Sequence, residues 1–161
     1  MPALAGVPQM ILRHMGKSFR ETFPTRASEW ALGTMLTLWG IILTSNTDLF
    51  DDSPSLYKLG EFAPQSTWAL LCLIAGVGRL AMLAVNGSWR RSPHLRAVSA
   101  FISCFFWFKI SHGLVEAGTF GTGLAVYPVL FLLDVYNTIR AAGDSGTADR
   151  RYTGAHNGPD A

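Results

Sequence analysis

The residues of this chain that could do chemistry are few, and two of them interrupt apolar stretches. Arg79 is the only charge between residues 68 and 85, and Asp134 lies six residues before Arg140, which closes another apolar stretch. If both stretches are membrane helices that start from the same boundary, both charges lie about 10 Å from it, because an α-helix rises about 1.5 Å per residue. An isolated charge at that depth costs at least about 2.5 kcal/mol. We therefore expect an Arg79–Asp134 ion pair within the membrane.

Two kinds of interpretation of this pair are open. As a functional group, it is a gate or a proton relay. As a structural group, it ties two helices together, or else Arg79 extends toward the aqueous boundary while Asp134 lies near water. We favour the structural interpretations, because a single pair does not build a pathway across a membrane.

A second group of polar residues consists of Lys109, His112 and Glu116, whose spacing places them along one side of a helix. A histidine between a cation and a carboxylate can titrate near neutral pH. More often such residues end a membrane span, with the lysine reaching the head groups and the glutamate in water, and we favour that interpretation. One histidine and one carboxylate are fewer than the three or four ligands that zinc needs, so we predict no metal site.

Sequence motifs of catalysis and of nucleotide binding are missing. The chain has no HExxH, CxxC or GxSxG motif and no phosphate-binding glycine loop. Its net charge is only +2, and no basic patch alternates with exposed aromatic residues, so we expect no nucleic-acid partner. We predict neither a catalytic residue nor a cofactor, and the lipid bilayer is the first partner expected.

The elements that carry these residues are expected to be membrane helices. Hydrophobic residues make up 49% of the 161-residue chain and charged residues 15%, below the roughly 25% that is usual in soluble domains. The predicted fold is all-α, an integral membrane bundle of four transmembrane helices. The predicted spans are about 29–46, 65–86, 96–115 and 120–139. They form one domain, 29–140, between a basic lead, 1–28, and a polar tail, 141–161, that is predicted to be disordered.

The distribution of basic residues predicts the orientation of the bundle. Ten of the 13 Lys and Arg residues lie in the lead, in the hinge 86–96 or after the fourth span, whereas the loop 46–65 is mainly acidic. Because basic segments stay on the cytoplasmic side, four spans with both termini inside satisfy the charge rule in every loop, and three spans do not. The hinge residues Arg90, Arg91 and Arg96 are the predicted topology determinants.

Small residues indicate where helices pack closely. Gly40 in the first span and Gly76 and Gly78 in the second are the predicted packing positions, since glycine lets two backbones approach. Two interpretations of the lead remain open. One is a basic amphipathic helix along the inner membrane surface, and the other is a loosely ordered segment that obeys the charge rule.

Two strings, WRRSPHLR between apolar spans and GLAVYPVLFLLDVYN after them, carry a resemblance. Over about Trp30–Ala142 the chain resembles small four-span membrane proteins encoded in tailed-phage and prophage gene sets. The resemblance implies a bacterial inner membrane and a phage or prophage origin, and it implies no activity and no functional residue.

Three functions are compatible with the sequence. We favour a non-enzymatic membrane protein that acts through helix packing with itself or with a membrane partner. The second is a holin-like or channel-type permeability protein, although a pore should show a continuous polar stripe and the charges are scattered. A membrane-embedded enzyme ranks lowest, because no cluster supplies a nucleophile, a base and an orienting partner.

Overall fold

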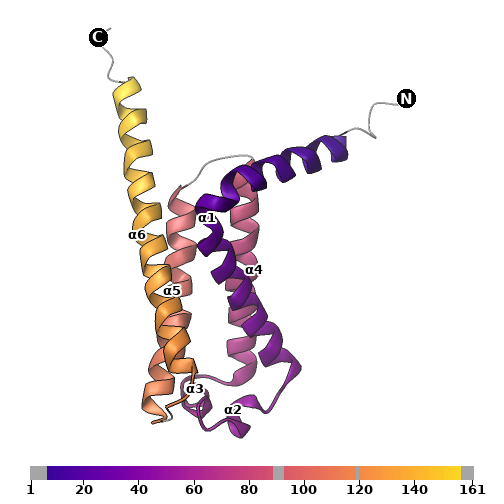
Figure 1. Ribbon diagram of the computed structural model, residues 1–161, viewed down its shortest axis with the longest axis vertical. Helices are drawn as coiled ribbons and strands as arrows, with labels where there is room; N and C mark the ends of the chain where they lie inside the picture. Colours follow the sequence, from indigo (N-terminus) through magenta and orange to yellow (C-terminus); the bar gives the residue numbers. More distant parts are fainter. Residues whose placement is uncertain (1–6, 89–92, 119, 157–161) are drawn as a thin grey trace.

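The computed structural model describes the backbone of residues 7–88, 93–118 and 120–156, and the side chains of residues 26–84, 94–118 and 120–146. All regular structure in these ranges is helical, so the predicted all-α class is confirmed. The four long helices run side by side, and two short helices lie across one end (Figure 1). The helices are α1 Val7–Ser45, α2 Leu49–Asp52, α3 Tyr57–Phe62, α4 Gln65–Ser88, α5 Pro93–Glu116 and α6 Gly123–His156.

The two ends of the bundle differ in what they carry. One end holds α2 and α3 and is called the loop end below (Figure 1). At the opposite end α1 begins and α6 finishes, and it is called the termini end. An even number of long helices therefore brings the first and last helical segments to the same end.

Three segments are long and apolar enough to cross a membrane, by length and composition: Gln65–Ala84, His94–Glu116 and Gly123–Gly146. They correspond to the second, third and fourth predicted spans. The first predicted span, 29–46, is helical as the second part of α1 but is not among the three. Its glycines, threonines and Glu29 lower the hydropathy of this segment.

α1 bends at Arg26, whose backbone angles of φ −127° and ψ 16° are not helical. Pro24 lies two residues earlier, and a proline inside a helix lacks the N–H for the usual hydrogen bond and bends the chain. The part of α1 before the bend points away from the bundle (Figure 1). The backbone of the lead is helical from Val7 onward, and its position along a membrane surface stays a prediction.

α6 continues to His156, which differs from the prediction of a span ending at residue 139 and a disordered segment after residue 140. The continuation is held by contacts that the sequence analysis did not assign. Ala141 and Ser145 are buried, and Asp144 binds an arginine of α5. Between residues 141 and 146, a stretch with two glycines therefore packs one of its faces on the bundle.

The loop half of the bundle has an apolar and aromatic core. Trp107 stacks on Tyr127, with ring centroids 6.2 Å apart and planes at 18°. The Tyr127 hydroxyl accepts a hydrogen bond of 3.1 Å from Trp39 Nε1, so one aromatic group joins α1, α5 and α6. Buried around it, toward the loop end, are Leu36, Leu43, Leu59, Trp68, Phe106 and Ile110.

α1 and α4 pack closely through two of the three predicted glycines. A Cβ on Gly76 would lie 2.5 Å from Thr37 Oγ1 and 2.6 Å from Thr37 N, and a Cβ on Gly40 would lie 2.8 Å from Leu73 N. Gly78 is different, because a Cβ there would meet no atom within 4 Å. Its predicted role in packing is therefore not seen within the described part of the chain, since Gly78 lies off the α4 face that carries Gly76.

Candidate functional site

Arg79 and Asp134 form a bidentate ion pair between α4 and α6. Arg79 Nη1 donates to Asp134 Oδ2 at 2.9 Å, and Arg79 Nη2 lies 2.6 Å from Oδ1. The two side chains are 1% and 0% exposed. Arg79 shares the buried face of α4 with Cys72, Gly76 and Leu83, at helical spacings of three and four residues. An arginine on a face that is otherwise apolar or small is thus directed into the bundle, where only a carboxylate can balance it.

Further polar groups of α6 lie on the same side as Asp134. Asn137, one turn later, is fully buried, and its Oδ1 accepts a hydrogen bond of 2.9 Å from Ser28 Oγ of α1. Thr138 Oγ1 donates to the Asp134 carbonyl at 2.8 Å and lies 3.8 Å from Cys104 Sγ of α5. These contacts connect the ion pair to both α1 and α5.

A second buried cluster lies at the termini end and joins three helices. Arg96 of α5 donates to Glu29 of α1 through Nε, at 3.1 Å to Oε2, and through Nη2 to Oε1. Its Nη1 donates to Asp144 Oδ2 of α6 at 3.1 Å. Glu29 is 3% exposed and Arg96 5%, whereas the Asp144 side chain is 53% exposed. The cluster is therefore a buried glutamate–arginine pair with one carboxylate at the surface.

Arg96 has a contact role that the sequence analysis did not predict. It was assigned, together with Arg90 and Arg91, as a determinant of orientation at the hinge. Arg90 and Arg91 lie outside the described residues. Arg96 instead extends into the bundle to bind Glu29 and Asp144.

The other predicted cluster, Lys109, His112 and Glu116, does not stay together. His112 Nδ1 lies 3.1 Å from Glu116 Oε2, with both side chains about half exposed. Lys109 is directed elsewhere, with its Nζ 4.1 Å from the centre of the Phe62 ring, so it binds α3 through a cation–π contact. Among the described residues, no group of three or more His, Cys, Asp or Glu side chains is placed to hold a metal ion.

The termini half of the interior is thus polar and the loop half apolar. Within the described parts of α5 and α6, buried atoms that make no hydrogen bond include Ser103 Oγ, Asn137 Nδ2 and, in the aromatic core of the loop half, Trp107 Nε1. They lie on α5 and α6, on the buried faces that also carry Arg96 and Asp134. Buried polar atoms without partners are uncommon, so Ser103 and Asn137 mark a part of the interior whose hydrogen bonding is incomplete.

Sequence reasoning missed Glu29, Asn137 and Asp144. A signal for the last two was present, because residues 134, 137, 141 and 144 recur at helical spacing and three of them are polar. The predicted end of the fourth span at residue 139 hid this pattern. Glu29 gave no signal of its own, since an acidic residue at the edge of a span is usually in water.

Comparison of the chain with protein-family models, with curated proteins and with solved structures finds no match.

Proposed function

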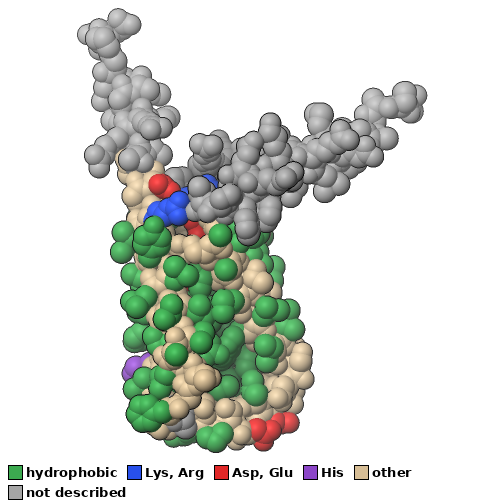
Figure 2. Space-filling model, viewed as in Figure 1, with side chains coloured by type: hydrophobic (Ala, Val, Ile, Leu, Met, Phe, Trp, Pro, Cys, Tyr) green, Lys and Arg blue, Asp and Glu red, His purple; other side chains and the backbone are tan. Residues whose placement is uncertain are grey.

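We propose that this chain is an integral membrane protein of four spanning helices, with both termini on the cytoplasmic side of a bacterial inner membrane. The observation that carries the membrane assignment is the distribution of side chains between the inside and the outside. Arg79 and Asp134 are fully buried, whereas the exposed side chains of the same helices include Leu70, Ile74, Leu132 and Ile139. Hydrophobic side chains cover the visible face of the bundle between charged groups at its two ends (Figure 2). Burying charges while exposing leucine and isoleucine is favourable only in lipid.

The pairing of α1 with α4 supports a fourth span. Gly33 approaches Leu80, Thr37 approaches Gly76 and Gly40 approaches Leu73, so the second part of α1 runs antiparallel beside α4 over this length. If α4 crosses the bilayer, this part of α1 lies at the same depth. Its modest hydropathy is then compensated because its glycines and Thr37 face α4, while Thr37 Oγ1 donates to Gly33 O at 2.8 Å.

The activity we propose is non-enzymatic, through association with a second copy or with another membrane protein. Two features support association. The bundle interior is occupied by paired charges and by large side chains such as Trp107 and Leu36. Gly78, in contrast, faces outward with open space around its Cα, on a helix surface that also exposes Leu71, Ile74 and Ala81. A small residue on a lipid-facing surface is where a helix of a neighbouring chain can approach closely.

The test of this proposal begins with fractionation and with topology. We expect the full chain to stay in bacterial membranes after alkaline washing and to require detergent for extraction. Reporters fused at either terminus should be active in the cytoplasm, and a reporter inserted between residues 46 and 64 should be active in the periplasm. Protein that remains in solution without detergent, or termini on opposite sides, contradicts the proposal.

Association is then measured by cross-linking in the membrane and by native electrophoresis. Gly78→Leu should reduce the cross-linked species by several-fold, because the larger side chain keeps a neighbouring helix at a distance. Gly146→Leu is the matched control, since Gly146 also has open space around it but lies at the polar end of the Gly123–Gly146 segment, two residues after Asp144. Equal effects of the two substitutions would show that Gly78 is not at an association surface.

A second candidate, a permeability protein, is favoured by one observation, the polar termini half of the interior. Arg79, Asp134 and Asn137 lie there, and Asn137 Nδ2 makes no hydrogen bond within the described residues. Inducing the protein in bacteria while following dye entry and membrane potential separates the two candidates. Rapid loss of potential supports the permeability protein, and unchanged potential together with a defined complex supports association.

A further inference from the structure

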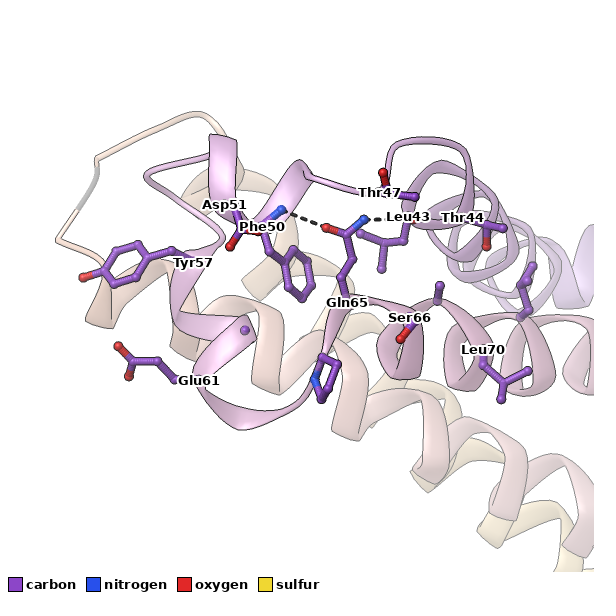
Figure 3. A pocket seen from close by; sticks show the side chains of 14 residues that line it. Leu43, Thr44, Thr47, Phe50, Asp51, Tyr57, Glu61, Gln65, Ser66 and Leu70 are labelled. Atoms are coloured by element: carbon purple, nitrogen blue, oxygen red, sulfur yellow. Dashed lines mark hydrogen bonds between the residues drawn. The ribbon is translucent and has the colours of Figure 1, made fainter.

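The loop end of the bundle contains a cavity of about 930 Å³, which is separate from the ion pairs described above. Its walls come from three places: the end of α1, the segment containing α2 and α3, and the beginning of α4 (Figure 3). Leu43, Ala69 and Leu73 supply apolar surface, and Leu70, which is 58% exposed, lies on the side of α4 that faces out of the bundle. The cavity is therefore continuous with the apolar outer surface of α1 and α4.

Gln65 holds the walls in place. Its Oε1 accepts a hydrogen bond of 2.8 Å from Phe50 N of α2, and its Nε2 donates to Leu43 O at 2.9 Å and to Asn46 O (Figure 3). One side chain thus ties α4 to the end of α1 and to α2. The cavity is preformed, so the protein loses less conformational entropy when a ligand binds.

The charges that line the cavity are both negative. Asp51 comes from α2 and Glu61 from α3, and no lysine or arginine is among the lining residues. Lys58 binds Glu61 from outside the cavity at 2.8 Å, and this hydrogen bond raises the pKa of the Lys58 ammonium. Glu61 is therefore already compensated, which leaves the exposed Asp51 carboxylate to attract a cation.

The beginning of α4 adds the opposite polarity. Pro64, Gln65 and Ser66 line the cavity where this 24-residue helix begins. Thr67 N and Trp68 N donate to Pro64 O, so the helix N-terminus offers an anion the N–H groups of Gln65 and Ser66 and its partial positive charge. The cavity thus combines an apolar wall, a carboxylate and a helix N-terminus. The apolar wall fits an acyl chain, the carboxylate fits an ammonium, and the helix N-terminus fits a phosphate. A zwitterionic lipid carries all three groups in one molecule.

We propose that this cavity binds a phospholipid whose head group carries an ammonium, taken from the leaflet at the loop end. One acyl chain lies along Leu70 and Leu73, the ammonium contacts Asp51, and the phosphate lies at the first turn of α4. This proposal rests on the membrane assignment made above. A phospholipid with an anionic head group and no ammonium binds more weakly, because it brings negative charge to Asp51 without a compensating cation.

The test uses the full chain in detergent and native mass spectrometry. The probes are dioleoyl phosphatidylethanolamine and dioleoyl phosphatidylglycerol, which share acyl chains and differ in the head group. We expect the ethanolamine lipid to bind the unaltered protein about fivefold more tightly, the effect of one partly exposed ion pair. Equal affinity for the two lipids overturns the proposal.

Two substitutions locate the site. Asp51→Asn should remove the preference for the ethanolamine lipid, and Asp52→Asn, its exposed neighbour in α2 outside the lining, should retain it. Ser66→Trp, at an exposed lining position, should weaken binding of the ethanolamine lipid by filling the cavity. A preference that survives Asp51→Asn, or is lost equally in Asp52→Asn, overturns the proposal.

The outcomes also separate this proposal from the one on which it rests. A chain that is soluble without detergent overturns both. A chain that needs detergent but does not distinguish the lipids overturns the lipid site alone. Lipid selectivity that persists in Gly78→Leu supports the site, because Gly78 lies outside the cavity lining.

Discussion

Each buried charge in this bundle is stable only together with its partner. Asp134 is fully buried and its carboxylate binds both terminal nitrogens of Arg79. Removing one member of such a pair leaves an uncompensated charge, which costs about 3–5 kcal/mol, whereas replacing both members by apolar side chains is often neutral. We therefore expect Asp134→Asn to lower the free energy of unfolding by about 3 kcal/mol, measured by titrating detergent-solubilised protein with a denaturing detergent.

The double variant Arg79→Met with Asp134→Leu is the control for this prediction. It removes both charges at similar volume and should recover most of the stability lost in Asp134→Asn. If the double variant restores stability, the pair is a structural tie. A double variant as unstable as Asp134→Asn, or an Asp134→Asn variant that folds normally but alters ion flux, would favour the relay interpretation.

At the scale of the helices, α1 and α4 approach each other closely at Gly76. A Cβ on Gly76 would lie 2.6 Å from the backbone nitrogen of Thr37, so the helices must separate to accept it. We expect Gly76→Ala to lower the free energy of unfolding by about 1–3 kcal/mol, the usual cost of overpacking. Gly78→Ala, two residues away in open space, should change it by less than about 1 kcal/mol in the same detergent assay. Similar losses from both substitutions would contradict the observed packing.

Gly76 and Gly78 also show how far the sequence predicts the helices and their packing. Hydrophobic length alone predicts α4, α5 and α6, because a membrane span needs a long apolar run. Gly76 and Gly78 occur in the same small-residue run, and only the rotation of α4 against α1 determines which of them faces the neighbour. That rotation depends on contacts between residues far apart in the chain, which one sequence does not reveal.

The contacts of the candidate site also divide into those that the sequence predicts and those that it does not. The Arg79–Asp134 contact was predictable because two opposite charges in apolar helices at similar depth have few other partners. The partners of Arg96 were not, since Glu29 precedes it by 67 residues and Asp144 lies beyond the predicted end of the last span. A run of arginines at a hinge is already explained by membrane topology. The sequence therefore gave no separate reason to expect a contact role for Arg96.

For the whole molecule, the proposed orientation assigns two separable roles to the hinge arginines. We expect Arg90→Gln with Arg91→Gln to shift part of the population to the inverted orientation, because the hinge then has little positive charge to keep it in the cytoplasm. Unfolding of the correctly oriented fraction should be unchanged. Orientation is measured with reporters fused at the C-terminus, and stability with the purified protein.

Arg96→Leu should lower stability and leave the orientation unchanged. It leaves Glu29 buried without its cation, so the free energy of unfolding should fall by about 3 kcal/mol, while Arg90 and Arg91 still supply the positive charge on which the proposed orientation depends. Glu29→Gln in the same chain should restore part of the loss, because the remaining buried group is then neutral. An Arg96→Leu variant that inverts without losing stability would mean that Arg96 acts through membrane topology, and that its contacts with Glu29 and Asp144 contribute little to holding α1, α5 and α6 together.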